Sequence, residues 1–297
     1  MRPIEKILVP VDFSEHAAAA LDRAVDLAKR FGARLTLLHA YELPGPAMTE
    51  YQISIPEPLA EQVRAAASTR LEALRERAAA GDLEVGCELV RGSAADAVAN
   101  VAASLEADLV VMGTRGNTGL QHLLLGSVAE RTVRTAPCPV LTVKADAARA
   151  REPISRILAA TDFSKSSDAA LEAAIDWAKR LGAELTLVHA LRLQAPLVTP
   201  YEVVFPQNLL DQARDAASRK LEQALEKARA AGVAAKAQIT SAPAVPALAE
   251  VAEEIGADLL VMGTRGHTGL AHVLLGSVAE RTLRLASCAV LTVKGPK

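Results

Sequence analysis

The chain contains the stretch ADLVVMGTRGNTGLQHLLLGSVAERTVR at residues 107–134 and repeats it 150 residues later as ADLLVMGTRGHTGLAHVLLGSVAERTLR at residues 257–284. The two stretches are identical at 23 of their 28 positions. Each one is typical of an apolar strand, followed by a glycine-containing loop and the start of a helix. We therefore expect a tandem duplication in which both copies keep the same loop.

The length of the chain agrees with this count, since 297 residues suffice for two domains of about 150 residues each. We expect one domain over residues 1–145 and a second over residues 154–297. The linker between them, residues 146–153, is short, rich in small and charged side chains, and ends in a proline.

Charge and hydropathy exclude several classes of partner. The formal net charge of −2 gives no reason to expect a nucleic-acid partner. No apolar run approaches the ~18 residues of a membrane helix, so no membrane partner is expected. The first apolar run is interrupted by Pro10 and Asp12 and is predicted to be a strand instead of a signal peptide. We expect a cytoplasmic protein.

The cysteines indicate a reducing compartment. No CxxC pair occurs, and Cys138 and Cys288 are repeat equivalents that each precede an apolar strand. Together with Cys87 they are expected to be buried free thiols.

Apolar runs alternate with helical patterns in both halves, which predicts an α/β fold. A helix is expected over residues 14–31, with Ser14 as its N-cap and Gly32 as its C-cap. Because the strands are apolar throughout, they are expected to be buried on both faces of a parallel sheet. The expected strands are residues 6–11, 35–40, 83–90, 108–112 and 140–144, then 157–161, 185–190, 233–240, 258–262 and 290–294.

The glycine loop has the composition of a phosphate-binding site. In parallel sheets, ligands bind at the carboxyl ends of strands, where the strand order reverses. Gly113 ends the fourth strand, and Gly116 permits either a positive φ or the close approach of an anion. Gly126 and Ser127 open a helix whose free N–H groups favour negative charge, and Arg115 adds a cation. The equivalents in the second half are Gly263, Gly266, Gly276, Ser277 and Arg265.

A simpler interpretation competes with this one. The glycines could serve only in tight turns, and the serine could serve only as a helix cap. The loop matches neither the Walker A pattern nor GxGxxG. The near identity of the two loops, in halves that otherwise diverge, favours the phosphate site.

The pattern Gly-x2-Gly-x9-Gly-Ser after DLVVMG, with PVDFS at residues 10–14, resembles the universal stress proteins of the ATP-binding type. The resemblance covers almost the whole chain, twice. It implies two tandem Rossmann-like or flavodoxin-like domains, each a five-stranded parallel sheet flanked by helices. It also implies a stress-response regulatory protein that holds ATP, with or without Mg²⁺, and hydrolyses little or none of it.

The resemblance assigns ligand contacts to named positions. Phosphates and ribose would contact Gly113, Thr114, Arg115, Gly116, Asn117, Thr118, Gly119, Gly126, Ser127 and Val128, and in the second half Gly263, Thr264, Arg265, Gly266, His267, Thr268, Gly269, Gly276, Ser277 and Val278. Adenine and ribose would contact the ends of the first two strands, at Pro10, Asp12, Ala40, Ala160, Asp162 and Ala190.

Asp12 and Asp162 have two interpretations. A carboxylate at the end of a strand can accept from ribose hydroxyls or help to hold a metal that phosphates bind. It can also simply support the N-terminus of the following helix.

Four histidines lie near the predicted site. His39 and His189 close the second strands and are expected to pack there. The remaining pair, His122 and His272, lies within the phosphate loops and is expected to be closer to a ligand.

Three functions remain open from the sequence. The first is a protein that holds ATP, which is not an enzyme. The second is a slow ATPase or a nucleotide hydrolase of related fold, although no second carboxylate or lysine pairs with Asp12 at a recognisable spacing. The third is an interaction module with vestigial pockets.

Assembly and site strength are also predicted. The last strands are expected at sheet edges, which favours an internal pseudo-dimer of the two halves and leaves room for a homodimer of chains. The first site is expected to bind more tightly, because Pro10 would fix a turn that Ala160 leaves looser.

Overall fold

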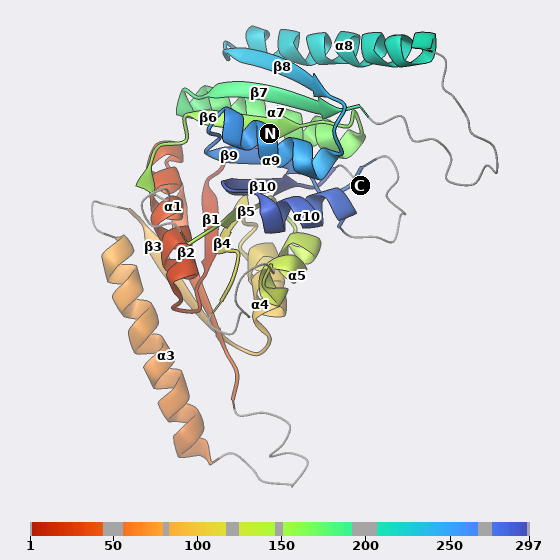
Figure 1. The fold of residues 1–297 in the computed structure, drawn as a ribbon. Coiled ribbons are helices and arrows are strands. Elements are labelled where there is room, and N and C mark those ends of the chain that lie inside the picture. The colour runs from red at the N-terminus through yellow and green to blue at the C-terminus, as the bar shows by residue number, and fades with distance from the viewer. Residues whose placement is uncertain are drawn as a thin grey trace, which may run out of the picture. The chain divides into compact units, whose positions relative to one another are not determined.

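The computed structural model describes residues 2–43, 56–79, 83–116, 125–145, 151–191, 207–266 and 275–295. Two compact units make up the chain, residues 2–152 and 153–297 (Figure 1). The predicted linker, residues 146–153, contains the boundary between them, although residues 146–150 lie outside the described part of the chain.

The first unit alternates strands and helices along the chain. Its strands pair in parallel in the order β3-β2-β1-β4-β5, so the order reverses between β1 and β4. The elements are β1 (Lys6–Pro10), α1 (Glu15–Phe31), β2 (Arg34–Tyr41), α3 (Glu57–Ala78), β3 (Val85–Arg91), α4 (Ala94–Ser104), β4 (Leu109–Gly113), α5 (Ser127–Thr135) and β5 (Val140–Val143).

The second unit repeats this arrangement, with the parallel order β8-β7-β6-β9-β10. The predicted α/β fold with a five-stranded parallel sheet in each half is thereby confirmed. The elements are β6 (Arg156–Ala160), α7 (Lys165–Leu181), β7 (Glu184–Ala190), α8 (Gln207–Ala230), β8 (Ala235–Thr240), α9 (Ala244–Glu254), β9 (Leu259–Gly263), α10 (Ser277–Leu285) and β10 (Ala289–Val293).

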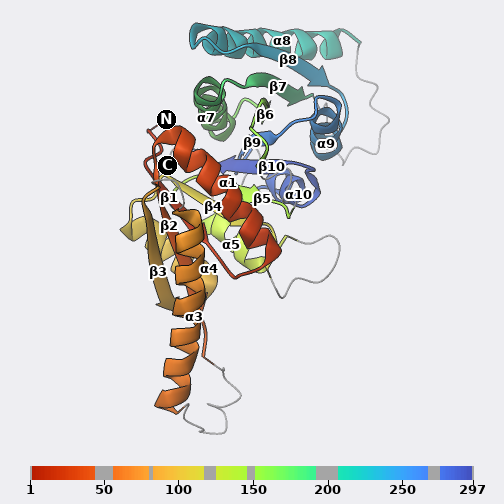
Figure 2. The same ribbon diagram turned by 90° about the vertical axis from the view of Figure 1, so that its left-hand side faces the viewer.

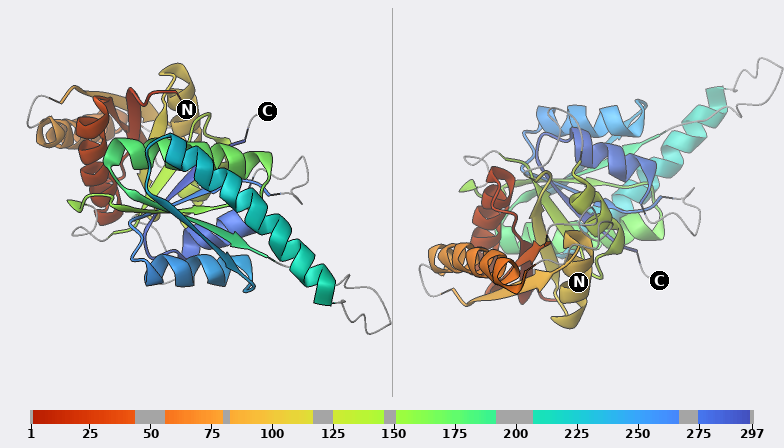
Figure 3. Two further views of the ribbon diagram at one scale, coloured as in Figure 1. Left: turned by 90° about the horizontal axis from the view of Figure 1, so that it is seen from above. Right: turned by 90° about the horizontal axis from the view of Figure 1, so that it is seen from below.

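Helices cover both faces of each sheet. In the first unit, α1 packs against β4 and β1 and lies beside α3, while α4 and α5 lie together on the opposite face. Figure 2 shows α7 on one side of the second sheet and α9 and α10 on the other. Figure 3 shows α8 lying along β8, against which it packs.

The strands of each sheet differ in how far they are buried. β4 and β5 are buried along their whole length. In β3 and β8, half-buried and exposed residues largely alternate, which the expectation of uniformly buried strands missed. α3 and α8 pack on one face of these two strands, and the residues that alternate with that face are largely exposed.

The caps of the first helix in each unit follow from the sequence. Ser14 precedes α1 and its side chain accepts a hydrogen bond from the amide of Ala17, and Gly32 ends the helix with φ of 68°. Ser164 and Gly182 do the same for α7, where Gly182 has φ of 67°. The predicted caps Ser14 and Gly32 are confirmed.

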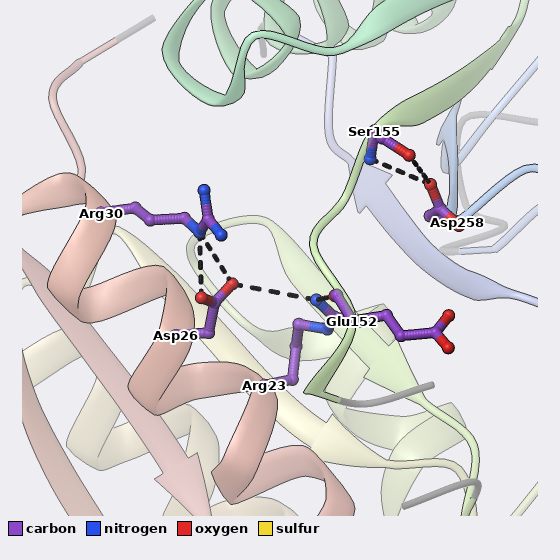
Figure 4. Close-up of polar contacts among 6 residues, drawn as sticks. All are labelled: Arg23, Asp26, Arg30, Glu152, Ser155 and Asp258. Carbon is purple, nitrogen blue, oxygen red and sulfur yellow. Dashed lines mark hydrogen bonds and ion pairs between the residues drawn. The ribbon is translucent and has the colours of Figure 1, made fainter. Parts of the chain in front are cut away.

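Hydrogen bonds hold the chain just before the unit boundary against α1 (Figure 4). Arg23 is almost wholly buried, and its Nη1 donates to the backbone carbonyl of Glu152 at 2.7 Å. Arg151 donates from Nε and Nη2 to Oδ2 of Asp22, at 3.1 and 3.0 Å. The second half has Ala173 in place of Arg23. The contact of Arg23 is therefore specific to the first half, which precedes the linker.

An aspartate before the fourth strand holds the start of the first strand in each unit. Asp108 Oδ2 accepts from the amides of Glu5 and Lys6, both at 3.0 Å. Asp258 Oδ2 accepts from the amide and the hydroxyl of Ser155, both at 2.9 Å, as Figure 4 shows. Both pairs align the central strands whose far ends build the site.

The structure also bears on cysteines and membranes. Cys138 and Cys288 are buried and form no disulfide within the described residues, as expected, while Cys87, also outside any disulfide, is only half-buried. Burial raises the pKa of the Cys87 thiol. None of the helices in the described ranges is both long and apolar enough to cross a membrane.

Candidate functional site

The turn after β1 holds the carboxylate of Asp12 in a fixed position. Oδ1 of Asp12 accepts from the amide of Ser14 at 3.0 Å and from its hydroxyl at 2.6 Å. Phe13 between them has φ of 64°, a left-handed conformation that a non-glycine residue adopts only at some cost. One carboxylate oxygen thus supports the helix start, as the simpler interpretation of Asp12 proposed.

The second unit builds the same turn. Oδ1 of Asp162 accepts from the amide of Ser164 at 3.0 Å, and Phe163 has φ of 61°. The two turns match although Pro10 ends β1 and Ala160 ends β6. The structure gives no support to a looser turn in the second half, which was the reason to expect tighter binding in the first.

A histidine from the second strand of each unit stabilises the turn, and in the first unit a guanidinium adds to it. His39 Nδ1 donates to the carbonyl of Val11 at 2.7 Å, and its ring packs at a tilt against the ring of Phe13, with centroids 4.4 Å apart. The guanidinium of Arg70 lies 4.1 Å from the centre of the same ring. His189 bonds the carbonyl of Thr161 at 2.9 Å in the second unit. These histidines pack at the strand ends, as expected.

Gly113 and Gly116 are glycines because of close approach and not because of positive φ. Neither has a positive φ, so that alternative is wrong. A Cβ on Gly113 would lie 2.8 Å from the carbonyl carbon of His16 in α1. A Cβ on Gly116 would overlap Oδ2 of Asp12. The loop after β4 therefore lies against both α1 and the carboxylate.

The start of α5 lies against the same loop. The amide of Gly126 donates to the carbonyl of Thr114 at 2.8 Å. Gly126 is the N-cap residue of α5 and has no side chain with which to cap the helix. Ser127 is its first helical residue, and Val128 follows it. Capping is thus not the role of Ser127, and the simpler interpretation fails for this residue.

A cavity of about 480 Å³ opens at the corresponding place in the second unit. It lies where β6, β7 and β9 end and where α10 begins, as expected at the point where strand order reverses. Of the seventeen lining residues within the described ranges, ten are predicted from the sequence, namely Ala160, Asp162, Ala190, Gly263, Thr264, Arg265, Gly266, Gly276, Ser277 and Val278.

The other lining residues were missed. Ala244 and Leu248 come from α9, four residues apart on one helix face. Thr161 and Ser167 come from the turn and from the first turn of α7, where the spacing to the N-cap Ser164 would have placed Ser167 nearby. The remaining three are Val188, Met262 and Ala279.

The rest of the predicted site can be placed only in part. Pro10 is the last residue of β1, and Ala40 lies near the end of β2, half-buried. The other predicted contacts lie outside the described residues: Asn117, Thr118, Gly119, His267, Thr268 and Gly269, with the histidines His122 and His272.

The charges at the site are few. Among the described lining residues of the second cavity, the charged ones are Asp162 and Arg265. In the first unit, burial and the nearby Arg115 lower the pKa of His16, while Asp12 and Glu15 oppose that shift. Within the described ranges, no group of three or more acids, histidines or cysteines could hold a metal ion by itself.

Position 16 and its equivalent share an unusual feature. His16 Nδ1 and Ser166 Oγ are both buried without a hydrogen-bond partner among the described residues. Each residue lies against the first loop glycine of its unit, since a Cβ on Gly263 would be 2.8 Å from the carbonyl carbon of Ser166. An imidazole in one half is thus replaced by a hydroxyl in the other.

Comparison with known proteins agrees with this architecture. The model of the universal stress protein family matches residues 3–144 and again residues 153–294. A universal stress protein of Methanocaldococcus jannaschii is 35% identical over 144 residues, which are 47% of this chain and 82% of that protein. Another from Thermus aquaticus is 39% identical over 140 residues, 46% of this chain and 97% of that protein.

A solved structure extends the likeness to both halves. The crystal structure of a universal stress protein from Archaeoglobus fulgidus matches with a TM-score of 0.75 and 25% identity. The match covers 98% of this chain and 97% of that one. With the family matched in each half, the chain belongs to the universal stress protein family, as a tandem of two such domains.

Proposed function

We propose that each half of this protein binds an adenine nucleotide, ATP in the first place, and holds it with little or no turnover. Occupancy would then set the conformation or the choice of protein partner during a stress response. The observation that carries the proposal is the cavity of about 480 Å³, in which a glycine loop, a helix N-terminus and a strand-end carboxylate meet. Its volume lies in the range of small-molecule sites.

The lining of the cavity fits the parts of a nucleotide. Ser277 and Val278 begin α10, where unpaired N–H groups and the helix dipole favour phosphate, and Arg265 adds a full positive charge. Val188 and Leu248 offer an apolar surface of the kind on which a base can lie. Asp162 is suited to accept from ribose hydroxyls.

A magnesium ion would depend mainly on the nucleotide. Asp162 is the one carboxylate among the described lining residues. Mg²⁺ requires six oxygen ligands and commonly takes one or two from carboxylates and the rest from phosphates and water. Asp162, and Asp12 in the first unit, would therefore be the residues that hold it beside bound phosphates.

Holding the nucleotide is favoured over hydrolysing it. A general base must reach the attacking water within hydrogen-bond distance. One oxygen of Asp162 already accepts from the amide of Ser164, and no second acid lines the described part of the cavity. A slow ATPase remains the alternative function and is an outcome of the test below.

The decisive experiment is to identify what the purified chain carries. We expect mass spectrometry of the denatured protein to release an adenine nucleotide, and calorimetry to give two sites per chain. Phosphate release should not exceed the rate in buffer. Steady hydrolysis that disappears with Asp12→Asn and Asp162→Asn would make the protein an enzyme. No binding at millimolar ATP would favour an interaction module instead.

Three other expectations remain predictions from the sequence: the internal pseudo-dimer of the two halves, a homodimer of chains, and the cytoplasmic location.

A further inference from the structure

Two hydroxyl side chains distinguish the second site from the first. Thr161 and Ser167 both line the cavity of the second unit, and both are at least nine-tenths buried. The equivalent residues in the first unit are Val11 and Ala17, which are also buried but carry no polar group on the side chain. The two sites therefore have the same residues in the described part of the phosphate loop and differ in the wall beside the strand-end carboxylate.

The two hydroxyls form a short chain of hydrogen bonds. Thr161 Oγ1 accepts from the amide of Phe163 at 3.0 Å and lies 3.3 Å from Ser167 Oγ. Ser167 Oγ donates to the carbonyl of Ser164 at 2.9 Å. Because that bond uses the only proton of Ser167, Thr161 must be the donor in the contact between the two hydroxyls.

This arrangement leaves Thr161 with acceptor capacity only. A hydroxyl has one proton and two lone pairs, and Thr161 has used its proton and one lone pair. Ser167 Oγ accepts from Thr161 and, at 3.5 Å, from the hydroxyl of Ser164, which occupies both of its lone pairs. The remaining lone pair of Thr161 can accept from a ligand that donates. Phosphate oxygens accept and are not suitable partners.

The hydrogen bonds of Thr161 and Ser167 are not needed to form the turn at Phe163. In the first unit Phe13 adopts φ of 64°, against 61° for Phe163, although Val11 and Ala17 cannot form these bonds. The serine N-caps of α1 and α7 also accept equivalent amide hydrogen bonds, although the hydroxyl of Ser14 donates to Asp12 and that of Ser164 to Ser167. A purely structural role would be shared by both units, so we attribute the hydroxyl pair to ligand binding.

We propose that Thr161 is a specificity-determining residue that makes the second site select one more hydrogen-bond donor of the bound nucleotide than the strand-end carboxylate accepts, while the first site lacks this added selection. Ser167 acts as a positioning residue, because it takes up the proton of Thr161 and so keeps Thr161 an acceptor. The donor is a ribose hydroxyl or the amino group of adenine. This inference rests on the proposed nucleotide binding.

The test compares four ligands at one site at a time. The full chain with Gly126→Asp reports the second site, and the full chain with Gly276→Asp reports the first. The ligands are ATP, 2′-deoxy-ATP, 3′-deoxy-ATP and purine riboside triphosphate, which lacks the amino group. For one of the three analogues we expect the loss of affinity relative to ATP to be about tenfold greater at the second site than at the first, the scale of one hydrogen bond. The analogue that loses affinity identifies the donor group of the nucleotide.

Substitutions then assign the effect. Thr161→Val should remove the discrimination at the second site and lower its affinity for ATP. Ser167→Ala should retain ATP but reduce the discrimination, because the Thr161 hydroxyl can then rotate and donate. The pair Val11→Thr with Ala17→Ser should introduce discrimination into the first site. Thermal unfolding should be little changed by Thr161→Val, since the first unit folds with valine there.

The outcomes separate this inference from the function on which it rests. If no analogue loses more affinity at the second site than at the first, or if Thr161→Val leaves that difference intact, the selection by Thr161 is wrong while nucleotide binding stands. If neither site binds ATP, the proposed function fails and this inference fails with it.

Discussion

Gly116 and Asp12 lie against each other with no room for a Cβ between them. They come from the ends of β4 and β1, the two strands at which the sheet order reverses. The second unit repeats the pair, where a Cβ on Gly266 would lie 2.5 Å from Oδ2 of Asp162. The loop predicted to bind phosphate and the carboxylate predicted to bind ribose are therefore in direct contact, and each fixes where the other can be.

Gly116→Ala should weaken nucleotide binding in the first half with little loss of stability. The new methyl group would displace the Asp12 carboxylate, whose other oxygen is held by Ser14. We expect affinity at that site to fall about tenfold or more, because a displaced carboxylate and loop lose at least one hydrogen bond to the ligand. Calorimetry on the full chain measures it. Gly86→Ala in β3 is the matched control, since its Cβ would meet only ordinary contacts, the nearest at 3.8 Å.

Gly113→Ala should behave in the opposite way and mainly destabilise the fold. Here the methyl group would meet the backbone of α1 at His16, at 2.8 Å from the carbonyl carbon, and backbone atoms cannot rotate away. Overpacking of this kind costs about 1–3 kcal/mol. Urea unfolding should show the loss, again against Gly86→Ala. An unchanged midpoint would mean that α1 can shift without cost.

The sequence predicted the residues of the loop but not which glycine does what. Spacing and strand ends are local patterns, so the strands, the caps Ser14 and Gly32, and most of the cavity lining could be predicted. Whether a glycine avoids a clash with Asp12 or with α1 depends on packing between distant segments. The same limit applies to Thr161 and Ser167, whose hydroxyls meet only after the turn at Phe163 has formed, and to Arg23, whose partner is 129 residues away.

Gly126→Asp should abolish binding in the first half through charge. A carboxylate would stand at the N-terminus of α5, where the proposed phosphates lie, and like charges at close range repel strongly. Gly126→Ala is the steric control. Its Cβ would be 3.3 Å from the carbonyl oxygen of Thr114, a tight fit that small shifts can relieve. Calorimetry should give one site per chain for the aspartate variant and two for the alanine variant. Two sites of normal affinity in Gly126→Asp would refute the loop assignment.

Arg23→Ala should loosen the chain before the unit boundary. It removes the hydrogen bond to the carbonyl of Glu152 and leaves a gap at an almost fully buried position. We expect a loss of about 1–3 kcal/mol in stability, the scale of a charged hydrogen bond, and faster cleavage by trypsin after Arg151. The exposed pair Arg64 and Glu61 offers a control, since Arg64→Ala should change little. Equal cleavage rates for the two variants would show that Arg23 does not hold this segment.

His16 should make the stability of the chain depend on pH. Burial lowers its pKa below the usual 6.5, Arg115 lowers it further, and Asp12 and Glu15 oppose the shift. As the pH falls, His16 therefore binds a proton near pH 6.5 in the unfolded chain and only at a lower pH in the folded chain. The stabilising effect of a neutral His16 is complete above pH 6.5 and is lost as the pH falls through the lower, folded value. His16→Ser, which copies the second half, and His16→Gln should both flatten the fall in unfolding free energy between pH 7.5 and about pH 5. Chemical denaturation across this range measures the slope. Identical slopes in the parent chain and in both variants would mean that His16 is equally easy to protonate in the folded and the unfolded state.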